Sequence, residues 1–310
     1  MKVIGVKGMG VKRVALFNPV AGPQWHAARV RRALDLLVEG EQVTIEETRV
    51  GRVVEQAREW LAAGATELIA CGGDGTACDV ATALEGSLVP LRIVPCGTTN
   101  VLARDLGIPV DPVHAIEAVV HSDAVRVINT WTAGAHHVVL GAGIGWDARL
   151  LHRLPRRYKR MLGLGAMVPL GAWLALRYDF PALEVNGIDE QGNACRLHGS
   201  SVLVCNIGHW GGRNVAFPGV DPSDDVLDVV VCEPRHFLHL AAFWSLLMIP
   251  GGRPLTLPGV RHLRFTSLTV AMIGAGAADV HVNGEVAGML RRGEAPLRMA
   301  PSGQVRVRVP

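Results

Sequence analysis

The sequence predicts a two-part protein: a parallel α/β domain with helices on its sheet, followed by an antiparallel, β-sandwich-like domain. Up to about residue 108, short apolar runs alternate with stretches in which apolar residues recur every three or four positions. From about residue 123, β-like segments follow one another with turn residues between them. We therefore expect domains at 1–125 and 126–310, and we allow for the last strand, about 295–310, to pack back on the first domain.

The first domain is expected to hold four strands, each followed by a helix. The expected strands are 13–17, 42–48, 66–71 and 91–97, and the expected helices are 25–38, 53–64, 77–84 and 99–107. Gly64 and Gly107 close two of these helices. In open parallel sheets, ligands bind at the carboxyl ends of the strands. Those ends carry polar residues and glycines here, at Asn18, Thr48, 72–76 and 95–98, so we expect a site there.

The second domain is expected to be mostly strands, with one long helical interruption at about 146–178. The expected strands lie at 124–133, 136–145, 182–189, 200–208, 226–233, 261–272 and 279–285. Another segment, 237–249, is apolar on most sides of a helix. Such a segment is typical of a helix buried in a domain or in a dimer interface.

Composition limits the class of protein. The chain has 310 residues, of which 49% are apolar and 19% charged, as in a compact globular protein with a large core. The net charge of +3 gives no argument for nucleic acid binding. The six cysteines include no C-x-x-C pair, which favours reduced thiols in a cytoplasmic protein without a zinc site. We expect no signal peptide, and the longest apolar stretch is shorter than the roughly 18–20 residues of a membrane span.

The first motif that carries chemistry is the run ELIACGGDGTACDVATAL at 67–84. Glycines between a strand and a helix let backbone amides approach a polyphosphate, and Thr76 adds a hydroxyl donor. The alternative is a simple strand-to-helix turn with Asp74 as a cap. Such a cap does not require two adjacent glycines, a third glycine and a threonine around the aspartate. A carboxylate beside phosphates is repelled unless a divalent cation or a transferred proton intervenes. Asp74 therefore favours phosphoryl transfer with a magnesium nucleotide.

Two further turns follow strands of the same expected sheet. Gly97-Thr98-Thr99-Asn100 comes after the fourth strand and opens a helix, so it offers a second set of amides and hydroxyls. Alone it is also compatible with an ordinary helix cap, and the turn at 18–22 alone is an ordinary turn. Together with 72–76, they predict a pocket built from loops at one sheet edge.

With these motifs the chain resembles the lipid kinases that share the diacylglycerol kinase catalytic domain, with sphingosine and ceramide kinases as relatives. The glycine loop is also similar to that of NAD kinases and phosphofructokinases, so it does not distinguish among them. The block P-x-G-T-x-N-x-x-A-R and the late D-x-L-D and G-E blocks favour the lipid kinases. The matching pieces are Asn18-Pro19 and Gly22, Thr48, 72–76, 95–109, GAGIGWDA, NIGHWGG, PGVDPSDDVLDVV and VNGE.

The resemblance implies phosphorylation of a lipid hydroxyl by ATP and Mg²⁺, in a cleft between two domains. It makes Glu285 the general base, a task that suits a carboxylate, with Asp74 assisting. It also implies a structural Mg²⁺ site at Asp221, Asp224 and the carbonyl of Val226. Without the resemblance, Glu285 reads as a solvated hairpin residue and the two aspartates as ordinary turn residues. The implied nucleotide contacts are Asn18, Thr48, Gly72, Gly73, Asp74, Gly75, Thr76, Ala77, Gly97, Thr98 and Asn100.

The chain departs from the family pattern at four places. Val101 stands where many relatives have Asp, no Lys follows shortly after Gly22, Asp225 replaces a Gly, and Asn283 replaces an Asp. Two other functions therefore stay open: a soluble-substrate kinase of the NAD kinase type, and a nucleotide- and lipid-binding regulator that has lost catalysis. The sequence does not identify the lipid.

A lipid substrate implies a membrane contact. The basic run 153–160 leads into the apolar stretch 161–178, which suits either an anionic bilayer surface or a solvated helix face followed by core. We expect a cytoplasmic protein that is peripheral at the inner membrane surface. Its expected partners are ATP and a lipid, with no nucleic acid, and a homodimer is left open.

Overall fold

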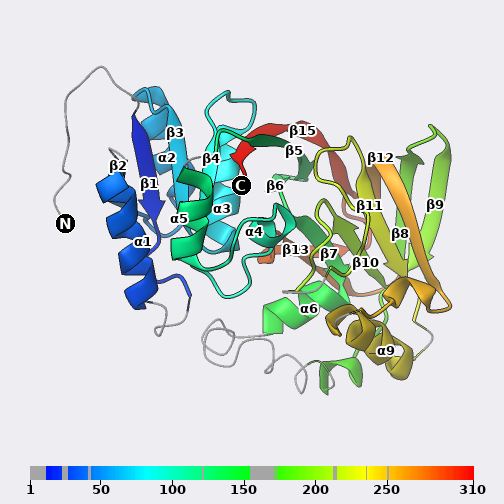
Figure 1. Ribbon diagram of the computed structural model, residues 1–310. Helices are drawn as coiled ribbons and strands as arrows, with labels where there is room; N and C mark the ends of the chain where they lie inside the picture. The colour runs from blue at the N-terminus through cyan, green and yellow to red at the C-terminus, as the bar shows by residue number, and fades with distance from the viewer. Residues whose placement is uncertain are drawn as a thin grey trace. The chain divides into compact units, whose positions relative to one another are not determined.

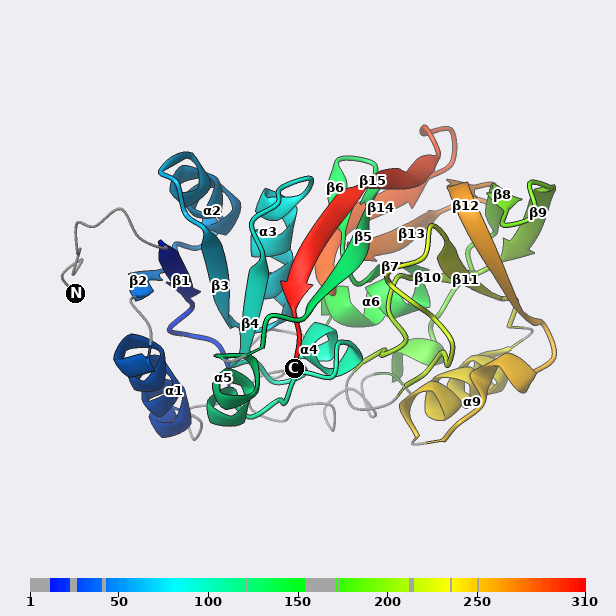
Figure 2. The ribbon, with the colours of Figure 1, turned by 45° about the horizontal axis from the view of Figure 1, so that its top comes forward.

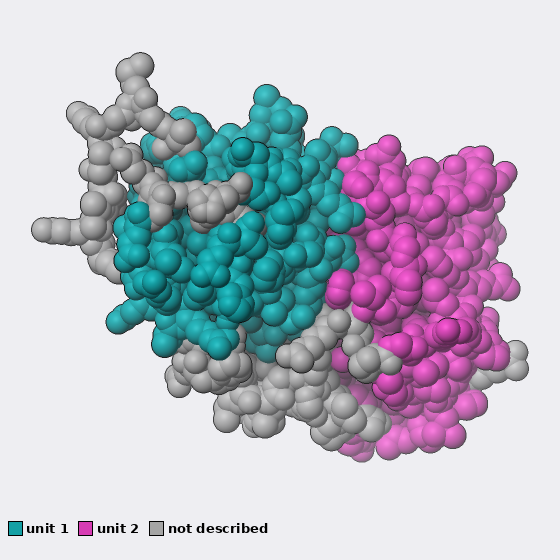
Figure 3. All heavy atoms as spheres, viewed as in Figure 1, with its two compact units in different colours: residues 1–128, 303–310 teal, residues 129–302 magenta. Residues whose placement is uncertain are grey.

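The computed structural model describes residues 12–22, 27–40, 43–120, 122–153, 171, 173–211, 215–234, 236–249 and 251–310. The chain divides into two compact units, coloured separately in Figure 3. The first contains residues 1–128 and 303–310, and the second contains 129–302. Two strands, β5 (Val125–Ala133) and β15 (Leu297–Arg308), have residues in both units.

The first unit is a parallel sheet with helices on both faces, as predicted. The strand order is β2-β1-β3-β4, and every pairing is parallel. Helices α1 and α5 lie on one face and α2 and α3 on the other (Figures 1 and 2). The bounds are β1 Arg13–Phe17, α1 Ala27–Gly40, β2 Val43–Glu47, α2 Val53–Ala62, β3 Glu67–Gly72, α3 Asp74–Leu84, β4 Leu91–Pro95, α4 Val101–Asp105 and α5 Pro112–Val120.

The central strands β3 and β4 are buried along their whole length, because helices cover both faces of a parallel sheet. Helix α5 lies where the sequence analysis assigns no element. Its start nevertheless carries a local signal. The Asp111 carboxylate accepts hydrogen bonds from the amides of Val113 and His114, and Pro112 occupies the first helical position.

The end of the chain belongs to the first unit. In β15, Val307 pairs in parallel with Leu91 of β4. The buried carboxylate of Glu67 in β3 forms ion pairs with three arginines, at 3.2 Å from Arg13, 3.1 Å from Arg92 and 2.5 Å from Arg308. A buried carboxylate needs such partners, because removing a charge from water without them is costly.

The second unit is antiparallel, also as predicted. Its strand order is β14-β13-β7-β10-β11-β12; β12 also pairs with β8 and β15, and β8 pairs with β9. One face holds a large apolar core that includes Trp131, Ile144 and Phe265, and helix α9 covers part of the other face. The bounds are β6 His136–Val138, β7 Gly141–Gly145, α6 Trp146–Arg153, β8 Leu183–Asp189, β9 Ala194–Gly199, β10 Ser201–Cys205, β11 Leu227–Cys232, α9 Phe237–Met248, η3 Pro254–Thr256, β12 Val260–Met272, β13 Ala277–Val282 and β14 Glu285–Arg291.

Several expected elements differ in detail. The segment 136–145 is two strands, and β9 and β14 were not predicted. The expected helix at 146–178 begins as α6, but residues 154–170, which contain most of the basic run and much of the apolar stretch after it, lie outside the described residues. No helix in the described part of the chain is both long and apolar enough to cross a membrane.

Candidate functional site

Asp74 is the first residue of helix α3, which begins three residues earlier than the sequence analysis expects. β3 ends at Gly72, and Gly73 is the N-cap with an extended backbone. The amide of Ala77 donates to the carbonyl of Gly73, so the first helical turn is Asp-Gly-Thr. Among the described residues, no side chain caps this helix, and its first amides lack partners within the helix. A helix start of this kind suits an anion.

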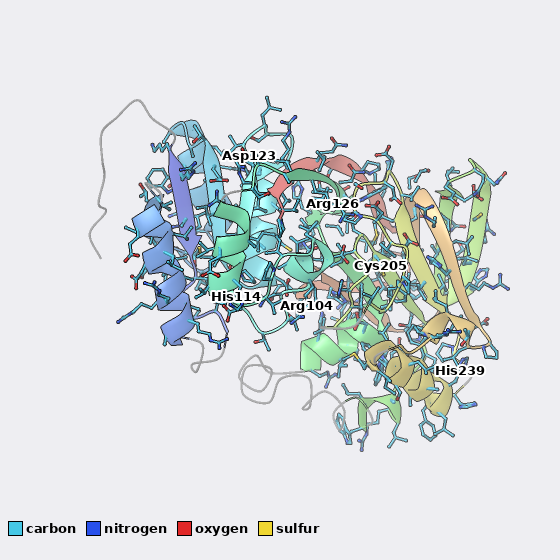
Figure 4. All side chains as sticks on the ribbon, in the orientation of Figure 1. Arg104, His114, Asp123, Arg126, Cys205 and His239 are labelled. Atoms are coloured by element: carbon cyan, nitrogen blue, oxygen red, sulfur yellow. The ribbon has the colours of Figure 1, made fainter. Side chains whose placement is uncertain are left out.

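The carboxylate of Asp74 is held by the second glycine-containing turn. The Thr99 hydroxyl donates to Oδ2 at 2.8 Å, and the Leu102 amide donates to Oδ1 at 3.2 Å. Arg104, labelled on α4 in Figure 4, donates from Nε to the Thr99 carbonyl at 2.9 Å. Each carboxylate oxygen has a second lone pair, so Asp74 keeps acceptor capacity for a water or a cation. The sequence analysis named Thr99 as part of this turn but did not include it among the site residues.

The glycines of these turns fall into two groups. A Cβ on Gly97 would lie 2.6 Å from the Cα of Gly73, and one on Gly72 would lie 2.4 Å from the Thr76 hydroxyl, so packing within the protein requires both. A Cβ on Gly75 would meet no atom within 4 Å. Packing therefore does not explain Gly75. Open space at the uncapped start of α3 fits a phosphate group that approaches the backbone closely.

The turn 18–22 lies against the same two loops. The Asn18 side-chain amide donates to the Thr76 hydroxyl at 3.2 Å. Gly22 has a positive φ of 72°, and a Cβ there would lie 2.1 Å from the carbonyl oxygen of Cys96. The three predicted turns of the first unit are thus brought together.

The remaining predicted nucleotide residues have mixed environments. Asn100 adopts a left-handed conformation, and its side chain bonds to both the amide and the carbonyl of Gly97 at 2.9 Å, so it has a structural role in the turn. Thr98 is exposed, Thr48 is half-buried and Ala77 is buried. Val101, one of the departures from the family pattern, is buried as the first residue of α4.

Two thiols lie at the ends of β3 and β4, next to the glycine turns. Burial raises the pKa of Cys71 well above its usual value and raises that of Cys96 to about 12. Both thiols therefore stay protonated at neutral pH, and neither supplies a thiolate nucleophile.

Glu285, in the second unit, begins β14 directly after a tight turn. Asn283 and Gly284 both have positive φ, as a two-residue hairpin of this kind requires. The Asn283 side chain accepts from the amides of Val139 and Leu140 at 2.9 Å each and donates to the His137 carbonyl at 2.8 Å. An ionised aspartate lacks that donor, so the departure at Asn283 gives the turn an additional bond. The turn thus holds the exposed Glu285 on a firmly anchored backbone.

The loop with the predicted metal ligands is held largely by its own hydrogen bonds. Asp221 accepts from the amide and the hydroxyl of Ser223, and Asp224 accepts from the amide of Val226. The other oxygen of Asp224 pairs with Arg264. Partial burial raises the pKa of Asp224, and the carboxylates of Asp228 and Asp221 add to the rise.

The predicted metal ligands Asp221, Asp224 and Val226 also have protein partners in this loop. No group of three or more His, Cys, Asp or Glu side chains with metal-binding geometry occurs among the described residues. A guanidinium on Asp224 competes with a cation for the same carboxylate. Asp225 has no positive φ, so the loop accommodates it in place of the family's glycine. Its carboxylate accepts from the Asn129 side chain at 3.1 Å. The Mg²⁺ site at Asp221, Asp224 and Val226 stays a prediction.

A buried pair in the second unit was not anticipated. His281 Nε2 lies 2.5 Å from Asp147 Oδ2, and both side chains are almost fully buried. A Cβ on Gly143 would lie 2.3 Å from the same imidazole nitrogen, so this glycine makes room for the pair. The motif GAGIGWDA thus supplies both Gly143, which leaves room for the imidazole, and Asp147, which pairs with His281 of β13.

Two family models match the chain. The diacylglycerol kinase catalytic domain matches residues 12–130, and the YegS C-terminal NAD kinase beta sandwich-like domain matches residues 148–303. The chain belongs to the YegS-like, diacylglycerol kinase-type family. Both models agree with the two units described above.

Individual relatives support this membership. The chain is 32% identical over 246 residues to an uncharacterized protein of Synechocystis, which is 72% of this chain and 54% of that protein. It is 29% identical over 226 residues to a probable lipid kinase YegS-like protein of Pseudomonas fluorescens, covering 65% of this chain and 73% of the relative. The chain thus spans about half the length of the first relative. A crystal structure of a putative diacylglycerol kinase from Bacillus anthracis shares the fold, with a TM-score of 0.74 at 18% identity over 100% of this chain and 99% of that one.

Proposed function

We propose that the protein is an ATP- and Mg²⁺-dependent kinase that phosphorylates the hydroxyl group of a lipid, a diacylglycerol-like molecule or a related alcohol. The observation that carries the proposal is the site around Asp74. Here a carboxylate is fixed by Thr99 and Leu102 beside an uncapped helix start, with open space at Gly75. Passive phosphate binding does not need a carboxylate at that place, whereas phosphoryl transfer does. Relatives described as probable lipid kinases support the lipid acceptor.

In this proposal the nucleotide phosphates bind at the amides of 73–76, with further contacts from Asn18, Thr48, Gly97 and Thr98. The lipid oxygen attacks the γ-phosphorus of ATP, a new O–P bond forms, and the bond between γ-phosphorus and the ADP oxygen breaks. Glu285 takes the proton of the lipid hydroxyl. The uncapped amides stabilise the negative charge that the phosphates carry.

Mg²⁺, when bound with the nucleotide, would neutralise phosphate charge and polarise the transferred group. The residue that fits a role toward that ion is Asp74, because its two oxygens keep unused lone pairs while Thr99 and Leu102 fix its orientation. The protein contributes the fixed carboxylate and the amide cradle.

The test is the identity of the phosphorylated product. The purified chain is incubated with ATP labelled at the γ-phosphate, a panel of lipids and, separately, NAD, and the label is followed into the organic and aqueous phases. The proposal predicts label in the organic phase that depends on added lipid and on Mg²⁺. Label only in the aqueous phase with NAD would instead indicate the NAD kinase-type alternative. ATP binding without any transfer would indicate a regulator that has lost catalysis.

A further inference from the structure

Helix α9 has an apolar side on which large described side chains are exposed. Its sequence FLHLAAFWSLLM contains no charged residue apart from the titratable His239, labelled on the helix in Figure 4. Leu240, Phe243 and Leu247 form the buried stripe that packs on the sheet and on neighbouring helices. The opposite stripe runs at helical spacing through Leu238, Ala242, Ser245 and Ile249, of which Leu238 is 61% and Ile249 is 53% exposed. The sequence analysis expected burial or a dimer interface for this helix, and the fold buries one side only.

A second segment adds to the same surface. Leu174, Ala175 and Tyr178 share an apolar cluster with Leu240 of α9, and Figure 1 shows α9 beside the short helical turn that contains 173–175. On the outer side of this turn, Trp173 is 49% and Leu176 is 64% exposed. We call Trp173, Leu176, Phe237, Leu238 and Ile249 the outer apolar surface. Exposed apolar side chains gathered in this way mark an interaction site more often than scattered ones do.

A positive charge lies directly at the outer apolar surface. The Arg177 guanidinium lies over the Trp173 ring, 4.4 Å from its centroid. Arg153 at the end of α6 and Arg253 after α9 are also exposed. The exposed Asp179 pairs with Arg149 at 2.5 Å, and the exposed Glu233 precedes the start of α9. The sequence from 234 to 278 contains no aspartate or glutamate. A surface with this charge complements an anionic partner.

We propose that the outer apolar surface docks on an anionic lipid bilayer and holds the protein at the membrane that contains its substrate; this inference rests on the proposed function. Tryptophan and arginine side by side suit the boundary between water and acyl chains, where an aromatic ring inserts and a guanidinium meets lipid phosphates. Apolar side chains together with Arg177 provide the two contributions that interfacial binding combines, buried apolar area and attraction to anionic lipids.

The test uses the full chain and two kinds of vesicle, phosphatidylcholine alone and phosphatidylcholine mixed in equal parts with phosphatidylglycerol. Co-sedimentation should show binding to the mixed vesicles that weakens with added salt, and much weaker binding to phosphatidylcholine alone. Leu238→Glu should weaken binding by about tenfold or more, because it places a charge where the acyl chains begin. Arg177→Gln should weaken binding less, and mainly at low salt.

Matched controls keep the result specific. Leu88→Glu makes the same change at an exposed leucine of the first unit, and Arg298→Gln removes an exposed arginine elsewhere in the second unit. Both should bind vesicles like the unaltered protein. Leu238→Ser is a milder variant, and it should also weaken binding if Leu238→Glu proves poorly folded by thermal melting.

Activity separates this inference from the proposed function. With a short-chain lipid dispersed without vesicles, Leu238→Glu should keep the turnover of the unaltered protein, while with lipid in mixed vesicles it should lose most of it. Equal vesicle binding by Leu238→Glu and the unaltered protein would overturn the docking surface. A light-scattering mass that falls from dimer to monomer on Leu238→Glu, with vesicle binding intact, would overturn it in favour of an interface between copies. Absence of any lipid phosphorylation would count against the proposed function alone, since vesicle binding is measured independently.

Discussion

The substitution Gly75→Ala tests whether Gly75 is needed for protein stability or for nucleotide binding. The added methyl group meets no protein atom within 4 Å, and the backbone at this position is helical. Replacing glycine by alanine in a helix stabilises the folded state by about 0.5–1 kcal/mol, and less at the first turn. For a chain of this size, the melting temperature should therefore rise by roughly 1–2 °C.

The nucleotide should respond in the opposite direction. If the phosphates lie against the amides of 73–76, the methyl group occupies space that a phosphate oxygen needs. We expect the Kd for a non-hydrolysable ATP analogue to rise about tenfold or more, which corresponds to roughly 1.4 kcal/mol of lost binding free energy. Differential scanning fluorimetry gives the stability, and isothermal titration calorimetry gives the affinity.

The matched variant is Gly97→Ala, whose methyl group would lie 2.6 Å from the Cα of Gly73. Backbone atoms cannot yield as a flexible side chain does, so we expect a loss of about 1–3 kcal/mol in the free energy of unfolding. If Gly75→Ala destabilises the protein as Gly97→Ala does, the glycine serves the fold. If it leaves the analogue's Kd unchanged, the phosphates bind elsewhere and the reasoning about open space fails.

The other predictions concern three carboxylates. Asp74→Asn should keep the melting temperature, because the change is nearly isosteric, and lower turnover by orders of magnitude; near-normal activity at saturating Mg–ATP would contradict the role of Asp74. Glu285→Gln should lower kcat by roughly a hundredfold or more with nucleotide affinity nearly unchanged, whereas a raised ATP KM with normal kcat would make it a binding residue. If the loop holds Mg²⁺, Asp224→Ala should abolish the rise in melting temperature that Mg²⁺ gives without ATP. An unaltered rise would remove the metal from this loop and leave Arg264 as the cation that Asp224 requires.

The fold class could be predicted from the sequence because the patterns that indicate the two domains are local. Alternation of strands with periodic helices up to residue 108, and turn-separated strands after residue 123, are properties of short windows. Helix α5 was missed although Asp111 and Pro112 mark its start, because nothing in the apolar pattern separates it from the preceding loop. Strands β9 and β14 were missed because each is the second, largely exposed half of a hairpin, and an exposed strand has little apolar alternation.

The sequence predicted which residue types form the candidate site, but it did not predict the side chains that hold them by hydrogen bonds. Glycines and Asp74 could be read from one window of sequence. Thr99, which fixes the Asp74 carboxylate, lies 25 positions away, and the pair is formed only when β3 and β4 become neighbours. His281 and Asp147 are 134 positions apart, and the sequence around either residue gives no sign of the contact between them. Contacts of this kind depend on sheet order, which a single sequence does not determine.

The ion pairs of Glu67 also bear on how the protein is made. Residues 303–310 provide Arg308 and the strand segment next to β4, and they are synthesised after all of the second unit. While the chain is still emerging from the ribosome, the first unit therefore has a carboxylate at its centre with part of its counter-charge missing and one edge of β4 without its last neighbour. Domains that are contiguous in sequence can fold one after another during translation. Here the first unit becomes complete only when the last strand returns to it, so a fragment that stops near residue 128 should be far less stable than the same residues supplied together with the 303–310 segment.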